Sequence, residues 1–253
     1  MAEGEAEVNG LAGDRALLGR TSTAERVSDI LRSRIAAGFF PPGARLSEDS
    51  IGGALGVSRN TLREAFRLLT HERLLEHQLN RGVFVRVLTD EDVVDIHRTR
   101  TLVECAVVRG LGEPPYAVGG LADAVRDGRR AAREGDWKGV STANIDFHRE
   151  LVALAGSART DELMRSVFAE LRLAFHVMGD PRRLHEPYIA RNRQILEALQ
   201  EGRRDDAEAL LVEYLDDSRR RLVDAYGRRD TKDAAKDAAK DATKDARDER
   251  GDG

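Results

Sequence analysis

The stretch LGVSRNTLREA, residues 55–65, decides how the N-terminal part of this chain folds. Gly56 and Ser58 suit a tight turn, and serine is a residue type that caps a helix start with its side-chain oxygen. Leu62, Ala65 and Leu69 then recur at helical spacing. The opposite face carries three arginines, each four residues from the next: Arg59, Arg63 and Arg67. This pattern predicts the turn and second helix of a helix-turn-helix.

Two further helices are expected on the N-terminal side of this turn. The first begins at Ser22, because Ser22 and Glu25 have the spacing of a capping box, and Gly38 ends it. The second is capped by Ser47, which two acidic residues follow. Residues 1–20 are polar and Gly-rich without periodicity, and we expect them to be disordered.

A β-hairpin is expected on the C-terminal side of the arginine-bearing helix. The run VFVRV, residues 83–87, follows the turn Asn80-Arg81-Gly82, and glycine in such a turn is typical of hairpins. Three short helices followed by a hairpin predict a winged helix-turn-helix over residues 21–88.

The same region is the expected partner of an anion. It holds ten arginines and seven acidic residues, a net charge of +3, whereas the whole chain carries −4. Side chains at the start of a recognition helix can reach base edges of double-stranded DNA. The residues expected to contact DNA are Arg45, Ser58, Arg59, Asn60, Thr61, Arg63, Arg67, Arg81 and Gly82. The alternative is a solvated helix face in an arginine-rich protein.

Beyond Thr89 the chain reads as one helix after another. The expected helices lie near residues 90–111, 117–134, 136–155, 159–178, 185–201 and 204–226. Short loops between amphipathic helices predict an antiparallel helical bundle over residues 89–227, so the fold class is mainly α. Residues 228–253 repeat lysine and aspartate and lack large apolar side chains, which predicts a charged low-complexity tail.

These motifs resemble those of the GntR family of bacterial transcription regulators. The segments that carry the resemblance are IAAG at 35–38, PGARLSE at 42–48, LGVSRNTLREA at 55–65 and RGVFV at 81–85. The helical half is similar to the FCD effector domain of the FadR branch. Its matching segments are RTLVE at 100–104, FHREL at 147–151 and ILEAL at 195–199.

The resemblance implies a homodimer that binds a palindromic operator, with one recognition helix in each half-site. It implies that Arg59 and Arg63 contact bases or phosphates, that Asn60 and Thr61 assist, and that Gly82 lies in the wing. It also implies a small-molecule effector in the helical domain, which in most such regulators releases repression.

Many FCD domains hold a divalent metal through one Asp and three His. By this resemblance the corresponding positions in this chain are Asn144, His148, Asn192 and Tyr214. An imidazole is a good ligand for transition metals, whereas an amide carbonyl and a neutral phenol are poor ones. Only His148 could bind a metal, so we expect neither a metal at this site nor any cofactor.

Helical periodicity, independently of the family resemblance, also places these four positions on the inward faces of three helices. Buried polar groups need partners, so they either bond to one another and to water or line an effector pocket. Arg100 would suit an anionic effector, although Glu104 could instead pair with it. Arg172 is a weaker candidate of the same kind. The expected effector-binding residues are Arg100, Asn144, His148, Arg172, Asn192 and Tyr214.

Composition excludes several other classes. The single cysteine, Cys105, has apolar neighbours and is expected in the core. The start lacks the pattern of a signal peptide and no long apolar run appears, so we expect a cytoplasmic protein without membrane contact. An enzyme with His148 as general base is an alternative, but no catalytic set accompanies it, and we predict no enzyme activity. A DNA-binding regulator without an effector is the other alternative.

Overall fold

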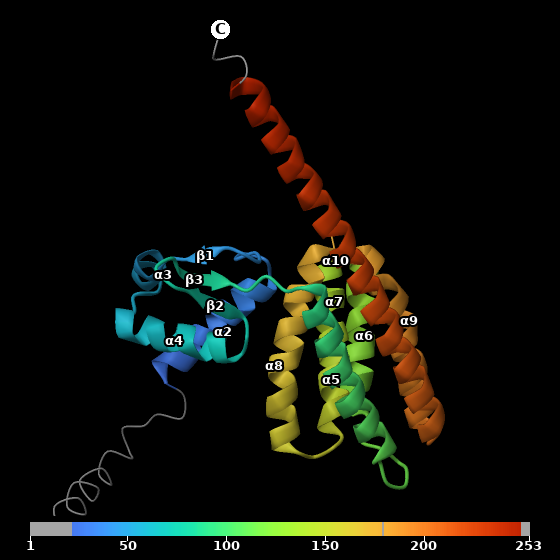
Figure 1. Cartoon of the computed structure of the whole chain (residues 1–253). Helices are drawn as coiled ribbons and strands as arrows, with labels where there is room; N and C mark the ends of the chain where they lie inside the picture. Colours follow the sequence, from blue (N-terminus) through green and yellow to red (C-terminus); the bar gives the residue numbers. More distant parts are fainter. Residues whose placement is uncertain (1–21, 179, 249–253) are drawn as a thin grey trace, which may run out of the picture. The chain divides into compact units, whose positions relative to one another are not determined.

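The computed structural model describes residues 22–178 and 180–248, so the expected disordered N-terminus at residues 1–20 lies outside the described residues. The chain divides after Arg86 into two compact units, which are considered one at a time (Figure 1). Among the described residues, no helix is both long enough and apolar enough to cross a membrane.

The N-terminal unit packs three helices with a small sheet. In chain order its elements are α2 (Thr23–Ala36), β1 (Arg45–Leu46), α3 (Glu48–Leu55), α4 (Arg59–His71), β2 (Leu75–Gln78) and β3 (Gly82–Val85). The three strands form one antiparallel sheet in the order β1-β3-β2. The inward faces of α2 and α4 bury Leu31, Ile35, Leu62 and Leu69. The predicted winged helix-turn-helix is confirmed.

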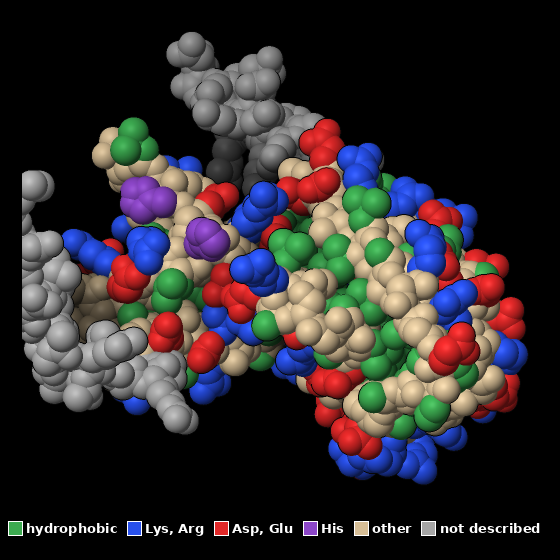
Figure 2. Space-filling model, turned by 90° about the horizontal axis from the view of Figure 1, so that it is seen from below, with side chains coloured by type: hydrophobic (Ala, Val, Ile, Leu, Met, Phe, Trp, Pro, Cys, Tyr) green, Lys and Arg blue, Asp and Glu red, His purple; other side chains and the backbone are tan. Residues whose placement is uncertain are grey.

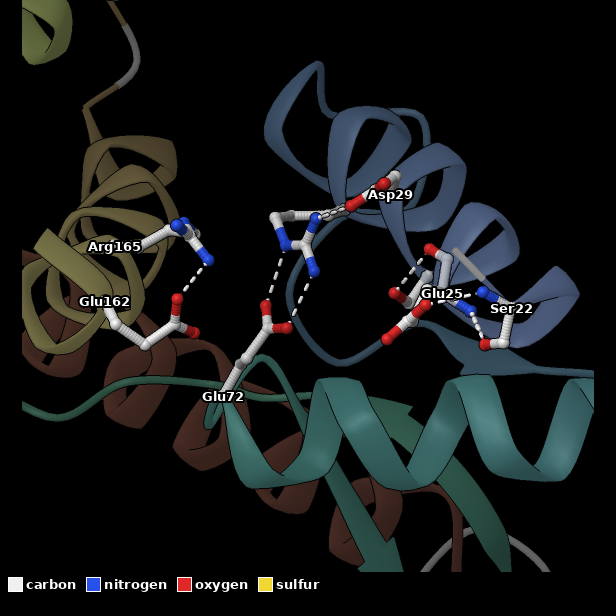
Figure 3. A network of polar contacts seen from close by, with 8 residues as sticks. Ser22, Glu25, Asp29, Glu72, Glu162 and Arg165 are labelled. Carbon is white, nitrogen blue, oxygen red and sulfur yellow. Dashed lines mark hydrogen bonds and ion pairs between the residues drawn. The ribbon is translucent and has the colours of Figure 1, made fainter. Parts of the chain in front are cut away.

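Local sequence explains the ends of these helices. Gly56 ends α3 with φ of 64°, a left-handed conformation that glycine adopts without a steric penalty. Ser58 then caps α4, because its Oγ accepts a hydrogen bond from the Thr61 amide at 3.1 Å. Ser22 and Glu25 form the predicted capping box at the start of α2 (Figure 3).

A tertiary ion pair ties α2 to the end of α4. The Arg32 guanidinium donates to both carboxylate oxygens of Glu72 at 2.7 Å, and Asp29 also pairs with it (Figure 3). Burial would lower the pKa of Arg32, but the hydrogen bonds to Glu72, the largest influence, raise it above its ordinary value. A two-point contact of this kind fixes the relative placement of the two helices.

The wing contains one more strand than the sequence predicted. The hairpin of β2 and β3 is confirmed, but Arg45 and Leu46 add β1, which pairs with Phe84 and Val83 of β3. A two-residue strand shows no alternation of apolar and polar residues, so the sequence contains no signal for it.

The C-terminal unit is a bundle of helices. Its elements are α5 (Asp90–Arg109), α6 (Gly119–Glu134), α7 (Trp137–Ala153), α8 (Ala158–Ala174), the 3-10 turn η2 (Phe175–Val177), α9 (Pro181–Gln200) and α10 (Arg204–Asp248). Helix α7 contacts α5, α6, α8 and α9, so it is the central element of the bundle. Cys105 of α5 is buried, as expected, and burial raises the pKa of its thiol to about 11.

Two helices differ from their expected ranges. Helix α9 begins at Pro181, four residues before the expected start at 185, because proline is well tolerated in the first turn of a helix. Helix α10 continues past residue 226 to Asp248, through the segment expected to be a charged tail. Alanine and lysine recur there, and both favour helix.

Candidate functional site

The first candidate site is the outer face of α4. The side chains of Arg59, Arg63 and Arg67 are 74%, 65% and 67% exposed, while the opposite face of the helix is buried. Asn60 is exposed and Thr61 half-buried in the first turn of α4, beside the capping residue Ser58. The structure therefore brings six of the predicted DNA-contacting residues together on one accessible face.

Each of these three arginines pairs with a carboxylate, which the sequence did not reveal. Arg59 Nη2 lies 3.0 Å from Asp49 Oδ1, and Arg63 Nε lies 2.9 Å from Glu48 Oε2, both acids belonging to α3. On α4 itself, Arg67 Nη2 lies 2.6 Å from Glu64 Oε1. Exposed pairs of this kind are weak, so phosphate can displace the carboxylates. The three arginine side chains stay largely exposed in these pairs.

The remaining predicted DNA contacts lie in the wing. Gly82 has φ of 109°, and a Cβ at that position would lie only 3.3 Å from Arg45 Nε. The positive φ favours glycine at this position, and a larger residue would also push the Arg45 side chain aside by a few tenths of an ångström. Arg81 is exposed at the turn, with its Cζ 5.6 Å from the ring centroid of Phe84. Arg45, Arg81 and Gly82 thus share one end of the sheet.

Charges of both signs occur on the helical unit. The space-filling view shows Lys and Arg side chains interspersed with Asp and Glu over the helical unit (Figure 2). Several arginines of this unit form ion pairs with acidic residues three positions away, such as Arg126 with Asp123 and Arg130 with Asp127.

The second candidate site is a polar cluster inside the bundle. Glu104 of α5 is fully buried and accepts a hydrogen bond from Arg100 Nε at 2.8 Å. Its second oxygen lies 2.7 Å from Nδ1 of His148, which is also fully buried. Arg100 is 1% exposed, so the ion pair that the sequence offered as an alternative does form, deep in the core.

Asn144 connects two other predicted residues, Asn192 and Tyr214, by hydrogen bonds. Its Oδ1 accepts hydrogen bonds from Tyr214 Oη and from Asn192 Nδ2, both at 2.8 Å. The Tyr214 ring packs on His148, with centroids 4.7 Å apart, so the two halves of the cluster are in contact. All four positions inferred from inward helix faces therefore converge.

The environment of the cluster sets its protonation. Burial would raise the pKa of Glu104, but the charge of Arg100 and the bond to His148 hold that pKa below its ordinary value. Burial lowers the pKa of His148. Glu104 is therefore ionised and His148 neutral at neutral pH, with the Nδ1 hydrogen donated to Glu104. Burial also raises the pKa of Tyr214, which remains a neutral phenol.

The donor set does not fit the divalent metal that FCD domains commonly hold. Tyr214 keeps its proton and donates it to Asn144, whose carbonyl oxygen already accepts two hydrogen bonds. Asp146, two residues before His148 in the sequence, pairs with Arg149 instead, and the Glu104 carboxylate is held by Arg100 and His148. In the described part of the chain, no group of three or more His, Cys, Asp or Glu side chains could hold a metal ion.

A small cavity lies beside the cluster. Its volume is about 10 Å³ for the centre of a water-sized sphere, close to the space that one water molecule needs. Small side chains of α6 and α7 line it together with Asn144, His185 and Asn192. Two polar atoms of these lining residues, Asn192 Oδ1 and His185 Nδ1, are buried without a hydrogen-bond partner. Orphaned polar atoms at a cavity wall indicate a site for a polar guest.

The structure separates Arg172 from this hydrogen-bond network. Its Nη1 contacts the Thr142 hydroxyl at 3.4 Å, at the limit of a hydrogen bond. Burial, and then the charge of Arg149, lower its pKa. Sequence reasoning gave no role to His185 and treated Glu104 only as an alternative partner of Arg100. The spacing of four residues between Arg100 and Glu104 was the available signal.

Comparison with known proteins agrees with this architecture. The description "Bacterial regulatory proteins, gntR family" matches residues 23–85, and "FCD domain" matches residues 95–217. A protein of Paenarthrobacter nicotinovorans described as "Probable D-xylose utilization operon transcriptional repressor" is 30% identical over 78% of this chain and 88% of its own length. The Nta operon transcriptional regulator of Aminobacter aminovorans is 28% identical over 70% of this chain and 83% of its own.

A solved structure extends the likeness to both units. The crystal structure of a GntR transcriptional regulator from Rhodococcus sp. RHA1 is 48% identical, covering 81% of this chain and all of that one, with a TM-score of 0.78. The family and these relatives are transcription regulators, not enzymes. This chain therefore belongs to the GntR family of bacterial transcription regulators and carries the FCD domain typical of the FadR branch.

Proposed function

We propose that this protein is a homodimeric repressor that acts in the cytoplasm on a palindromic DNA operator. A small molecule bound in the helical unit lowers its affinity for that operator. The observation that carries the proposal is the exposed row of Arg59, Arg63 and Arg67 on α4. Two recognition helices of a dimer would read half-sites roughly 34 Å apart. The similarity to a relative described as a D-xylose utilization operon repressor supports repression rather than activation.

The position of α7 supports control by a ligand. This helix bears Asn144 and His148 and contacts α5, α6, α8 and α9. Helix α5 starts at Asp90, shortly after the N-terminal unit ends at Arg86. A ligand that binds beside Asn144 in only one arrangement of these helices would shift the population toward that arrangement. Operator affinity then changes by the coupling free energy between the two sites.

Selection of genomic fragments by the purified protein tests this function. The selection is made at near-physiological salt, because DNA affinity depends steeply on ionic strength. Enrichment of a short palindrome is expected, and mass measurement of the protein on that duplex should give two chains. Failure to enrich any sequence would contradict operator binding.

A second candidate is a regulator that binds its operator without an effector. It is favoured by the bonds that Asn144, Asn192 and Tyr214 make to one another, since such bonds can simply fix the packing of a core. Release of the operator by a metabolite separates the two candidates. An operator affinity unchanged by every metabolite tested would favour the second.

We further propose that the polar cluster binds no transition metal. After incubation with Zn²⁺ and desalting, the protein should retain no stoichiometric zinc by elemental analysis. The matched control is the triple variant Asn144→Asp, Asn192→His and Tyr214→His, which supplies one carboxylate and two imidazoles beside His148. This variant should gain about one zinc per chain. Stoichiometric zinc in the unmodified protein, lost on His148→Ala, would overturn the proposal.

A further inference from the structure

A groove lies on the outer side of α6, between α6 and α9. Its volume is about 540 Å³, within the range of small-molecule sites. The apolar part of its lining includes Val125 of α6 and Ile189 of α9. The polar part consists of three arginines of α6, namely Arg126, Arg129 and Arg133. Among the residues that the structure describes, no acidic side chain lines the groove, so it is a basic surface with an apolar floor.

Two of these arginines are free to bind an anion. Arg126 pairs with Asp123 at 2.6 Å, and its neighbour Arg130 pairs with Asp127 at 3.1 Å. Over the described residues, neither Arg129 nor Arg133 forms an ion pair. They are four residues apart on α6, a spacing at which like charges repel. An anion placed between them would relieve that repulsion and form charge-assisted hydrogen bonds.

The groove adjoins the inner cavity. Val125 and Ile189 line both spaces, so their side chains form the wall that the two share. Rearrangement of these two apolar side chains would join the groove and the cavity into one site. Other cavity-lining residues include Ala124, Gly128 and Ala143, which are small and leave room for a guest.

The two ends of this combined site demand different chemistry. At the inner end, Asn192 Oδ1 is an acceptor without a partner, and Asn144 Oδ1 already accepts two hydrogen bonds. A carboxylate there would face a carbonyl oxygen, whereas a hydroxyl can donate to it. His185 Nδ1 offers a second unpaired position. At the outer end, Arg129 and Arg133 require a negative charge.

We infer that the effector site is the joined groove and cavity between α6 and α9. It takes a polyhydroxylated anion with its charged group at Arg129 and Arg133 and a hydroxyl at Asn192. The inference rests on the proposed function, which it makes more specific. The charged group lies on the surface of α6, and the inner end holds neutral hydroxyls where FCD domains commonly hold a metal.

Ligand-detected NMR titration of the unmodified protein without DNA tests both ends at once. The probes are aldonates of four to six carbons, the alditols of the same length, which lack the charge, and the alkanoates, which lack the hydroxyls. At least one aldonate should bind about tenfold more tightly than its matching alditol and alkanoate, in the presence of EDTA. An alditol or alkanoate that binds as tightly as the matching aldonate would overturn the inference. So would a protein that binds none of the probes.

Substitutions of single residues and pairs test which side chains bind each end of the ligand. Arg129→Gln with Arg133→Gln should weaken aldonate binding about tenfold. The control, Arg130→Gln with Arg165→Gln, removes two exposed, ion-paired charges that do not line the groove and should change aldonate binding less than about twofold. Asn192→Leu should remove the preference for aldonate over alkanoate, and Gln200→Leu, exposed on the same helix, should not. Equal losses in the two arginine pairs would overturn the assignment of the outer end.

The measurement also separates this inference from the proposed function. Aldonate binding by a protein that enriches no operator would leave the site intact and refute the repressor. Operator enrichment together with release by a ligand insensitive to Arg129→Gln and Arg133→Gln would keep the repressor and refute the site.

Discussion

Replacing Glu104 with leucine is expected to destabilise the helical unit by about 3–5 kcal/mol. Glu104 is fully buried, and its removal leaves the guanidinium of Arg100, 1% exposed, without a counter-charge. His148 loses its hydrogen-bond partner at the same time. For a unit of this size the loss corresponds to a fall in Tm of roughly 10 °C. Urea denaturation followed by circular dichroism measures it.

Two controls assign the effect to the buried charge. Adding Arg100→Leu to Glu104→Leu removes the unpaired cation and should recover a large part of the lost stability. Glu208→Leu breaks a surface pair with Arg109, whose side chain is 68% exposed, and should change stability little. A Glu104→Leu protein as stable as the Glu208→Leu protein would contradict a buried ion pair.

Replacing Arg63 with alanine is expected to weaken operator binding roughly 10- to 100-fold. Arg63 lies between Arg59 and Arg67 in the centre of the exposed row on α4, where either a base or a phosphate contact would be lost. Titration of the operator duplex and of a scrambled duplex, at several salt concentrations, distinguishes the two kinds of contact. A base contact lowers the affinity for the operator alone, whereas a phosphate contact lowers both and reduces the salt dependence.

The matched control for Arg63 is Arg126→Ala. Arg126 is an equally exposed arginine of the helical unit, 65% accessible and likewise paired with a carboxylate. Its removal should leave operator affinity unchanged. An Arg63→Ala protein that binds the operator normally would show that the arginine row of α4 is only a solvated surface.

Local patterns predicted most of the fold because each depends on neighbours in the chain. Ser58, Gly56 and the apolar positions of α4 act within a few residues of one another, so the turn and helix could be read directly. Strand β1 could not be predicted from the sequence, because its two residues form a strand only by pairing with β3, about forty positions away. The start of α9 was placed four residues too late, because Pro181 lies in its first turn, and proline there gives no apolar periodicity by which to recognise a helix.

The polar cluster was predicted only in part, because sequence patterns identify the inward face of each helix but not the helix that packs against it. Helical periodicity placed Asn144, His148, Asn192 and Tyr214 on inward faces, and they do meet. Periodicity does not state which helices face each other, so the bond between Glu104 and His148, 44 residues apart, was missed. The pairing of Glu48 with Arg63 likewise depends on the packing of α3 against α4.

The lone cysteine makes this protein convenient for distance measurements in solution. Thiol reagents attack the thiolate, and Cys105 is 4% exposed with its pKa raised to about 11, so it stays unreactive at neutral pH. A Leu79→Cys substitution, at a wing position that is 81% exposed, would then be the single site of labelling. A spin label there would report the separation of the two wings of a dimer with and without ligand, without further change to the native chain.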